Sequence, residues 1–303
     1  MKECTIYIDV PEKFLKGAGI PNSRFIPSYI YQIKIILKNN SSQKKQCSFS
    51  ATMGNGIRYL ENIKHEGPDI NLLDTVSAVE PCKELANDNV IIFGNNLTLS
   101  PNSTNTIIFD GALCDKYTIN SIENSGDKIP HRSKINFYAH LLDEDKIDDS
   151  YFISSTAMDS DMIVKCDDEK LNAGDITKYY IDICTGQYDL ARKVYLRSIL
   201  DAGLEYIGDS CNLEPRNIYE FNGKTIIKWD IGSLQPSEIK RIGYKVKVKN
   251  DAKGKLTNKL NSNCINNSTY TQCPVSCKYT IEVCWKKIRR RSIKIKISSP
   301  VLL

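Results

Sequence analysis

The chain has 303 residues, a length at which two domains of ordinary size are expected. Hydrophobic residues make up 41% of it, which is enough for a packed core and excludes a wholly disordered protein. The formal net charge of +5 is modest and predicts no nucleic-acid partner. No apolar run reaches the length of about 18 residues that a membrane-spanning helix needs, so we expect no membrane partner either.

Strand-like runs of β-branched and aromatic residues recur along the chain, whereas Ala-rich helical stretches are absent. Residues 1–10 alternate in polarity as a strand does, and they lack the basic and apolar regions of a signal peptide. The later runs are 30–37, 89–93, 106–109, 178–183, 224–229 and 244–248. Asn222-Gly223 predicts a hairpin, and segment 189–200 fits either a strand or an amphipathic helix. We therefore predict an all-β fold.

The two halves of the chain resemble each other. Residues 29–36, 54–60 and 97–103 resemble residues 178–183, 201–207 and 231–237, in the same order. Because the offset has the size of a domain, this repeat predicts two related β-domains in tandem. We place an N-terminal β-sandwich at 1–163 and a C-terminal one at 164–303, with acidic residues clustered near the boundary. The second domain ends in a basic strand or tail.

Three ordered segments of the second half carry a resemblance to a known family. Residues 201–206 read Asp-Ala-Gly-Leu-Glu-Tyr, 229–238 read Trp-Asp-Ile-Gly-Ser-Leu-Gln-Pro-Ser-Glu, and 243–248 read Gly-Tyr-Lys-Val-Lys-Val. Together they resemble the repeated β-sandwich modules of bacterial surface proteins. The first half keeps the Gly-Ile-x-Tyr turn and the Leu-x-Pro-Asn-Ser segment but has no Trp-Asp pair. The resemblance implies tandem Ig-like β-sandwich domains.

The physical roles of this motif are structural. Trp229 suits a buried anchor between two sheets, and Asp230 suits a cap on the turn that follows. Gly232 suits an unusual backbone angle, and Pro236 the start of a loop. No catalytic residues are predicted here.

Eleven cysteines are candidates for disulfide formation and cross-linking. They are Cys4, Cys47, Cys82, Cys114, Cys166, Cys184, Cys211, Cys264, Cys273, Cys277 and Cys284. The odd count leaves at least one thiol free or paired with another chain. Disulfides indicate an oxidising location, but the N-terminus predicts no export. A protein made in the cytoplasm of a mother cell and left on the spore surface when that cell lyses would satisfy both.

Length, cysteine count and the Asn/Lys/Ile-rich composition also resemble the cysteine-rich exosporium proteins of clostridial spores. That resemblance implies a subunit of a two-dimensional crystalline layer held by disulfides. Its partners would be copies of itself and other spore-surface proteins, with no cofactor. The alternative is a surface-displayed binding module for protein or carbohydrate.

Other kinds of site fit the sequence less well. Cys264, Cys273, Cys277 and Cys284 include only one of the two close cysteine pairs that zinc sites usually have, so disulfides are preferred to a metal. The acidic residues at 143–149 and 159–169 leave structural calcium open, although a solvated loop is the default. Lys–Asn isopeptide bonds also stay open. Three histidines in unsuitable contexts and no G-x-S-x-G turn predict that the protein is not an enzyme.

Overall fold

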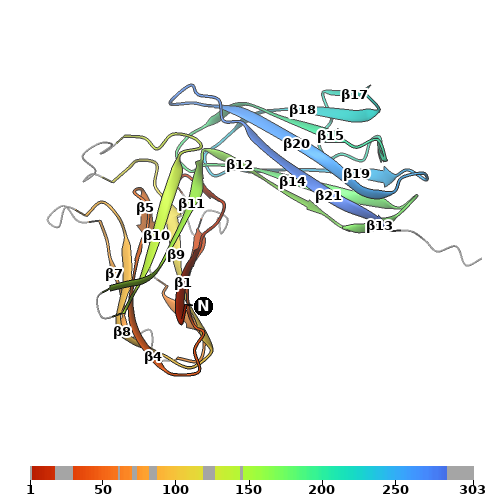
Figure 1. Ribbon diagram of the computed structural model, residues 1–303. Coiled ribbons are helices and arrows are strands. Elements are labelled where there is room, and N and C mark those ends of the chain that lie inside the picture. Colours follow the sequence, from red (N-terminus) through yellow and green to blue (C-terminus); the bar gives the residue numbers. More distant parts are fainter. Residues whose placement is uncertain are drawn as a thin grey trace, which may run out of the picture.

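We describe a computed structural model of the chain. The described residues are 2–17, 30–60, 62–69, 74–81, 87–118, 127–143 and 146–284. This part is built of strands, and it contains no helix long and apolar enough to cross a membrane. The strands form four sheets, two in each half of the chain (Figure 1). The predicted all-β fold with tandem Ig-like β-sandwiches is confirmed.

The first sandwich contains β1 to β11. Their bounds are β1 (Cys4–Asp9), β2 (Lys13–Leu15), β3 (Tyr31–Asn39), β4 (Lys45–Thr52), β5 (Ile57–Tyr59), β6 (Lys64–Glu66), β7 (Val76–Val79), β8 (Ile91–Leu99), β9 (Ser103–Leu113), β10 (Lys134–Asp143) and β11 (Lys146–Met158). One sheet has the order β1-β3-β9-β5, with β6 also paired to β9. The other has the order β2-β11-β10-β4-β8-β7.

The second sandwich contains β12 to β21. Their bounds are β12 (Ser160–Cys166), β13 (Lys170–Asn172), β14 (Ile176–Thr185), β15 (Ala191–Leu200), β16 (Leu204–Tyr206), β17 (Asn217–Phe221), β18 (Lys224–Leu234), β19 (Ile239–Val248), β20 (Gly254–Asn266) and β21 (Val275–Cys284). Its four-stranded sheet has the order β12-β14-β19-β16, and its six-stranded sheet the order β13-β21-β20-β15-β18-β17.

The two sandwiches have equivalent strand orders. Replacing β1, β3, β9 and β5 by β12, β14, β19 and β16 converts one sheet into its counterpart, and the six-stranded sheets correspond in the same way. Even the short parallel pairing of β2 with β11 has its equivalent in β13 with β21. The repeat seen in the sequence is therefore a repeat of topology.

Two local predictions have clear outcomes. Asn222 and Gly223 have positive φ values of 49° and 71° and join β17 to β18, so the hairpin is confirmed. Within segment 189–200, residues Ala191–Leu200 form the strand β15 rather than a helix, because the apolar side chains pack inward at alternate positions between β18 and β20.

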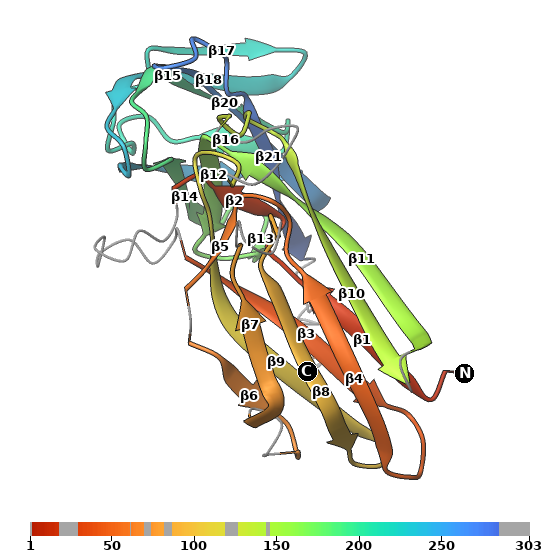
Figure 2. The ribbon, with the colours of Figure 1, turned by 90° about the vertical axis from the view of Figure 1, so that its left-hand side faces the viewer.

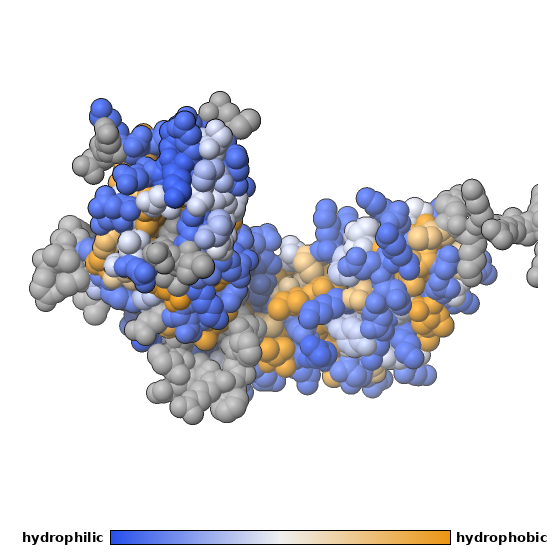
Figure 3. All heavy atoms as spheres, turned by 90° about the horizontal axis from the view of Figure 1, so that it is seen from below, coloured by the Kyte–Doolittle hydropathy of each residue, from blue (hydrophilic) through white to orange (hydrophobic). Residues whose placement is uncertain are grey.

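Asp159 alone separates β11 from β12, and the predicted boundary at 163/164 falls inside β12. The strands of the two sandwiches run in very different directions, so the molecule is bent at this junction (Figures 1 and 2). From below, the two lobes meet at a waist where hydrophobic residues gather among hydrophilic ones (Figure 3). The predicted basic run at 286–296 lies outside the described residues.

Candidate site at the domain junction

The residues directly after β2, Lys16 and Gly17, lie between the two sandwiches. The Lys16 N–H donates to the Met158 carbonyl at 3.0 Å, and the Gly17 N–H donates to the Leu113 carbonyl at 2.8 Å, both in the first sandwich. In the other direction, the Gln187 N–H of the second sandwich donates to the Lys16 carbonyl at 3.0 Å. The backbone at Lys16 is thus hydrogen-bonded to both sandwiches.

The Lys16 side chain is buried at the junction, with only 2% of its surface exposed. Its ammonium lies 3.0 Å from an Asp159 carboxylate oxygen and 3.9 Å from Asp115. Lys128 lies 3.8 Å from Asp115 and also pairs with Asp189 of the second sandwich. A buried charge is tolerated only when it is paired, so this network disfavours any movement that separates the sandwiches.

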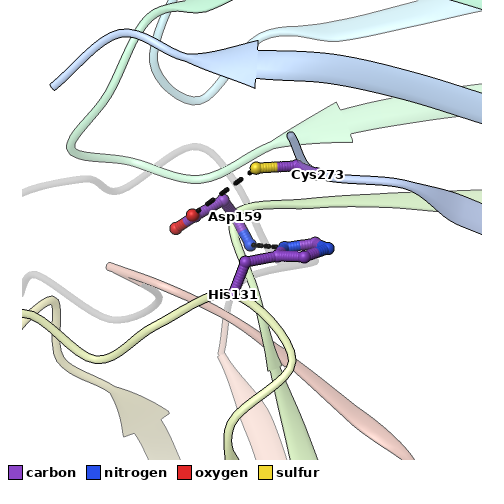
Figure 4. A group of neighbouring side chains, drawn as sticks. All are labelled: His131, Asp159 and Cys273. Atoms are coloured by element: carbon purple, nitrogen blue, oxygen red, sulfur yellow. Dashed lines mark hydrogen bonds between the residues drawn. The ribbon is translucent and has the colours of Figure 1, made fainter. Parts of the chain in front are cut away.

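A histidine, a carboxylate and a thiol meet beside this network (Figure 4). His131 comes from the turn before β10, Asp159 from the junction, and Cys273 from the residues just before β21. The Asp159 N–H donates to His131 Nδ1 at 3.1 Å, and the Cys273 thiol donates to an Asp159 carboxylate oxygen at 3.7 Å. Since Nδ1 accepts a hydrogen bond, the proton of the neutral ring lies on Nε2.

Cys264 completes the group from the adjacent strand. The Cys273 N–H donates to the Cys264 carbonyl at 2.9 Å, which places the two cysteines opposite each other across the sheet. A hydrogen bond with Cys273 lowers the pKa of the Cys264 thiol, and the same bond, together with burial, raises that of Cys273. The two thiols therefore form a buried pair within the second sandwich.

The ligand atoms of His131, Asp159 and Cys273 lie within 4.8 Å of one another, a spacing that could suit a metal ion. Two observations oppose this assignment. The lone pair of His131 Nδ1 already accepts the Asp159 N–H, and the Lys16 ammonium already neutralises the Asp159 carboxylate. A cation placed here would face that ammonium, so these residues suit an ion-pair network better than a metal centre.

The same geometry is unlike that of a thiol enzyme. Burial lowers the pKa of His131, while the pKa of Cys273 is raised. Both shifts favour the neutral imidazole and the neutral thiol. A cysteine nucleophile needs the opposite arrangement, a thiolate beside an imidazolium.

The candidate cysteines fall into groups by burial. Cys82 lies outside the described residues. The buried ones are Cys4, Cys47, Cys184, Cys264 and Cys273, the half-buried ones are Cys114, Cys166, Cys211 and Cys277, and Cys284 is exposed. All ten described cysteines are free thiols in the structure. Burial raises the pKa of Cys47 and Cys184 to about 12 and that of Cys277 to about 11, so these thiols react slowly.

The motif residues of the second half lie along β18 and the turn after it. Trp229 is buried between the sheets, and its indole N–H donates to the Leu213 carbonyl at 3.0 Å. Asp230 lies within the strand and pairs with Arg216 at 3.1 Å, so the cap predicted for the following turn is wrong. Gly232 has a φ of 87°, and Pro236 lies in the turn between β18 and β19.

Several carboxylates of the acidic segments have lysine partners. Asp149 lies 2.6 Å from Lys2, and Asp161 lies 2.8 Å from Lys13. No motif in the sequence predicts these lysine partners. For the junction network one local signal exists, because the charged residue Lys16 directly follows the apolar pair Phe14-Leu15.

No family model matches the chain, and no curated protein matches it. Solved structures do resemble it. A red sea bream transglutaminase is 10% identical over 94% of this chain and 32% of its own, with a TM-score of 0.36. The full-length major pilin SpaD of Corynebacterium diphtheriae is 10% identical over 92% of this chain and 66% of its own, with a TM-score of 0.33.

A type I cohesin of Pseudobacteroides cellulosolvens is 10% identical over 42% of this chain and 93% of its own, with a TM-score of 0.30. The chain thus spans about a third of the transglutaminase and 66% of the pilin. Similarities this weak indicate nothing about activity. They assign the chain to no family.

Proposed function

We propose that the chain is a non-enzymatic structural subunit of a layer on a spore or cell surface. Copies of it, with other surface proteins as further partners, would assemble into a two-dimensional lattice that disulfides cross-link. In a spore, the protein would be made in the mother cell and remain in the exosporium. No cofactor is needed for this role.

The observation that supports this proposal most is the buried junction. A lattice subunit must hold its domains in one relative orientation, because neighbouring copies repeat that geometry. Lys16 is hydrogen-bonded to both sandwiches and ion-paired with Asp159, while Lys128 and Asp189 pair across the junction. An adhesin with a flexible linker would have no use for buried charges between its domains.

The placement of the thiols divides the cross-linking proposal into two parts. Cys264 and Cys273 face each other inside one sandwich, so a disulfide between them would be internal. Cys284, at the end of β21, is exposed and can reach another chain without unfolding. It is the best candidate for an intermolecular bridge among the described cysteines.

Non-reducing gel electrophoresis of the purified full chain tests this. We expect a ladder of oligomers that collapses to a single band of about 34 kDa, the 34.3 kDa of the chain, when reductant is added. One bridging thiol per chain can give only a dimer, so a ladder requires a second bridging cysteine besides Cys284. The variant Cys284→Ser should therefore leave no band above the dimer. Cys184→Ser, which removes a buried thiol, is the matched control and should keep the ladder. A monomer band in every non-reduced lane would contradict the proposal.

One observation favours a second role, as a surface binding module. The second sandwich has a large basic groove on its outer face.

A further inference from the structure

A groove with a volume of about 1070 Å³ lies on the outer face of the six-stranded sheet of the second sandwich. This sheet includes β15, β18 and β20, which are uppermost in Figure 1. One end of the groove reaches the domain junction, where Arg132 of the first sandwich donates to the Pro274 carbonyl at 2.6 Å. The groove is therefore built by both sandwiches.

The charge of this groove is strongly positive. Its cationic side chains are Arg132, Lys193, Arg197, Arg216 and Lys228. Among the described residues that line it, the one carboxylate is Asp230, which is already paired with Arg216. Lys193 and Arg197 have no ion-pair partner among the residues that the structure describes. Such a site attracts an anion and leaves it free donors to bind.

Two of these cations are held close together by the sheet itself. Arg197 on β15 lies directly opposite Lys228 on β18. Lys259 on β20 and Lys278 on β21 form a second such pair next to the groove. Like charges at directly opposite positions destabilise a sheet. On its other side, Arg197 lies opposite Asn261 on β20, so that strand supplies no acidic partner for it. A bound anion would remove this repulsion.

The backbone is unusual at the edge of the groove. The register of β15 shifts between Ala191 and Val194, and Lys193 has a φ of 51° in this bulge. Positive φ is uncommon for lysine, and bulges near binding sites serve to redirect a side chain. Here the bulge coincides with the point where the Lys193 side chain lines the groove.

The rest of the lining is rich in amides and hydroxyls. Asn261 on β20 lies opposite Ser276 on β21, and Asn217 on β17 lies at the other end of the same cross-strand row, beyond Arg197 and Lys228. Together with Asn263 they contribute donors and acceptors that suit sugar hydroxyl groups. Tyr195 is half-exposed and supplies one aromatic face. Trp229 also lines the groove, but its ring is buried in the core, so Tyr195 is the one exposed ring among the described lining residues. One exposed ring is few for a nucleic-acid groove, which usually stacks successive bases on several rings.

The groove continues past the junction. A neighbouring hollow of about 300 Å³ shares Arg132, Val275 and Ser276 with it and adds the cations Lys13 and Lys134 of the first sandwich. Among the described residues that line this hollow, Glu12 is the only carboxylate. Lys13 is already paired with Asp161 at 2.8 Å, so Lys134 is the cation that the hollow adds to the groove. Cations thus follow one another from one sandwich to the other, which suits a chain-like ligand better than a single small anion.

We propose that this groove binds an acidic polysaccharide, with arginine and lysine side chains holding carboxylate, phosphate or sulfate groups while Asn and Ser side chains bind sugar hydroxyls. This goes beyond the structural role and does not depend on it. A lattice subunit could use such a site to hold an acidic glycan against the layer.

Binding of immobilised polysaccharides to the full-length chain, followed by biolayer interferometry, tests the proposal. The probes are polygalacturonate for carboxylate groups, heparin for sulfate groups and dextran as a neutral control. We expect binding to at least one acidic probe, no binding to dextran, and weaker binding as salt rises. The variant Arg197→Gln/Lys228→Gln should weaken binding by about tenfold or more, because it removes charge-assisted hydrogen bonds.

The matched control is Lys165→Gln/Lys245→Gln, which removes two exposed cations from the four-stranded sheet. It should change binding less than about twofold, in line with weak effects of distant, screened charges. The groove variant should unfold at the same or a higher temperature than the unmodified chain, since it removes a repulsive pair. Lys193→Asn is a second test, and it should also weaken binding to the acidic probe. Asparagine tolerates the positive φ of the bulge, but the substitution removes the charge.

Three results would overturn the proposal. The first is an absence of binding to both acidic probes. The second is equal weakening by the control and groove variants, which would mean attraction to net charge alone. The third is tighter binding of a single-stranded oligothymidylate than of either glycan, which would assign the groove to nucleic acid.

Discussion

The two sandwiches share one strand order but fill the same place in their cores differently. In the first, Phe49 on β4 lies opposite Gly94 on β8. In the second, the equivalent strands place Leu196 opposite Trp229. A Cβ added to Gly94 would lie 2.7 Å from the Phe49 ring, so the glycine makes room for that ring. The large aromatic side chain has moved from one strand to its neighbour.

A second difference lies next to the first. In the core of the second sandwich, the hydroxyl oxygens of Tyr244 and Ser198 are 2.8 Å apart. The Asn258 amide accepts a hydrogen bond from Ser198 and donates one to Tyr244, each at 2.7 Å. At the equivalent strand positions of the first sandwich, Ala51 stands in place of Ser198, Phe109 in place of Tyr244 and Phe137 in place of Asn258. One core is apolar at this point and the other is hydrogen-bonded.

These differences show why the Trp-Asp pair is missing from the first half. The space that Trp229 fills is filled there by Phe49, so the absence of one motif residue is offset by a residue on the neighbouring strand. Core volume and the alternation of buried positions are kept, which is what the fold requires. Similarity of sequence is then weak even where topology is the same.

The largest expected effect is loss of either aromatic anchor. Trp229→Ala and Phe49→Ala should each destabilise their sandwich by about 3–5 kcal/mol, since both side chains are fully buried. Denaturant unfolding measures this, and Trp229→Phe should have a clearly smaller effect. If Phe49→Ala were nearly neutral, the equivalence of the two anchors would be wrong.

The junction lysine has no counterpart in the second sandwich. Lys16 and Gly17 follow β2, and Ala173 and Gly174 follow the equivalent β13. Lys16→Ala therefore gives the first sandwich the residue that the second has at this position, but it leaves the Asp159 carboxylate without its ammonium partner. We expect a loss of about 3 kcal/mol and separate unfolding of the two domains in calorimetry. A single unshifted transition would show that the network does not couple them.

The polar group of the second core gives a smaller effect. Tyr244→Phe should cost about 1–2 kcal/mol, because Ser198 and Asn258 lose a buried partner. Replacing all three at once, with Ser198→Ala, Tyr244→Phe and Asn258→Leu, should restore much of that loss, as the apolar first core indicates. If the triple variant is less stable than Tyr244→Phe alone, the two cores are not interchangeable at this point.

The smallest effect concerns pH. Burial keeps the pKa of His131 below its usual value in the folded chain, with Asp159 opposing this shift and Arg132 and Lys16 adding to it. The unfolded chain then binds a proton more readily than the folded one. Stability should fall as pH drops below about 6.5, the ordinary histidine pKa. Urea midpoints measured at several pH values should show a shallower fall for His131→Gln than for the unmodified chain.

The sequence predicted the runs with strong β-formers, such as those in β3 and β14. It did not predict β20, which reads Gly-Lys-Leu-Thr-Asn-Lys-Leu-Asn-Ser-Asn-Cys-Ile-Asn. Asn and Lys have low strand propensity, so this strand depends on pairing with β15 and β21 on either side. Local propensity cannot reveal a strand that its neighbours stabilise.

The junction was still harder to predict. Lys16, Asp115 and Asp189 are far apart in the sequence, and none stands in a recognisable motif. They meet because the end of β2 enters the space between the sandwiches. The cysteines were easy to identify, but whether each is buried or exposed depends on the fold alone. The groove was missed for the same reason, since Arg197 and Lys228 become neighbours only through pairing of β15 with β18.

Negative-stain electron microscopy of the purified full-length chain, before and after reductant, tests the proposed structural role most directly. We predict ordered sheets with a regular two-dimensional repeat, which disperse only when disulfides are reduced. Isolated bent two-lobed particles at every concentration, with no ordered assembly under oxidising conditions, would contradict a lattice subunit.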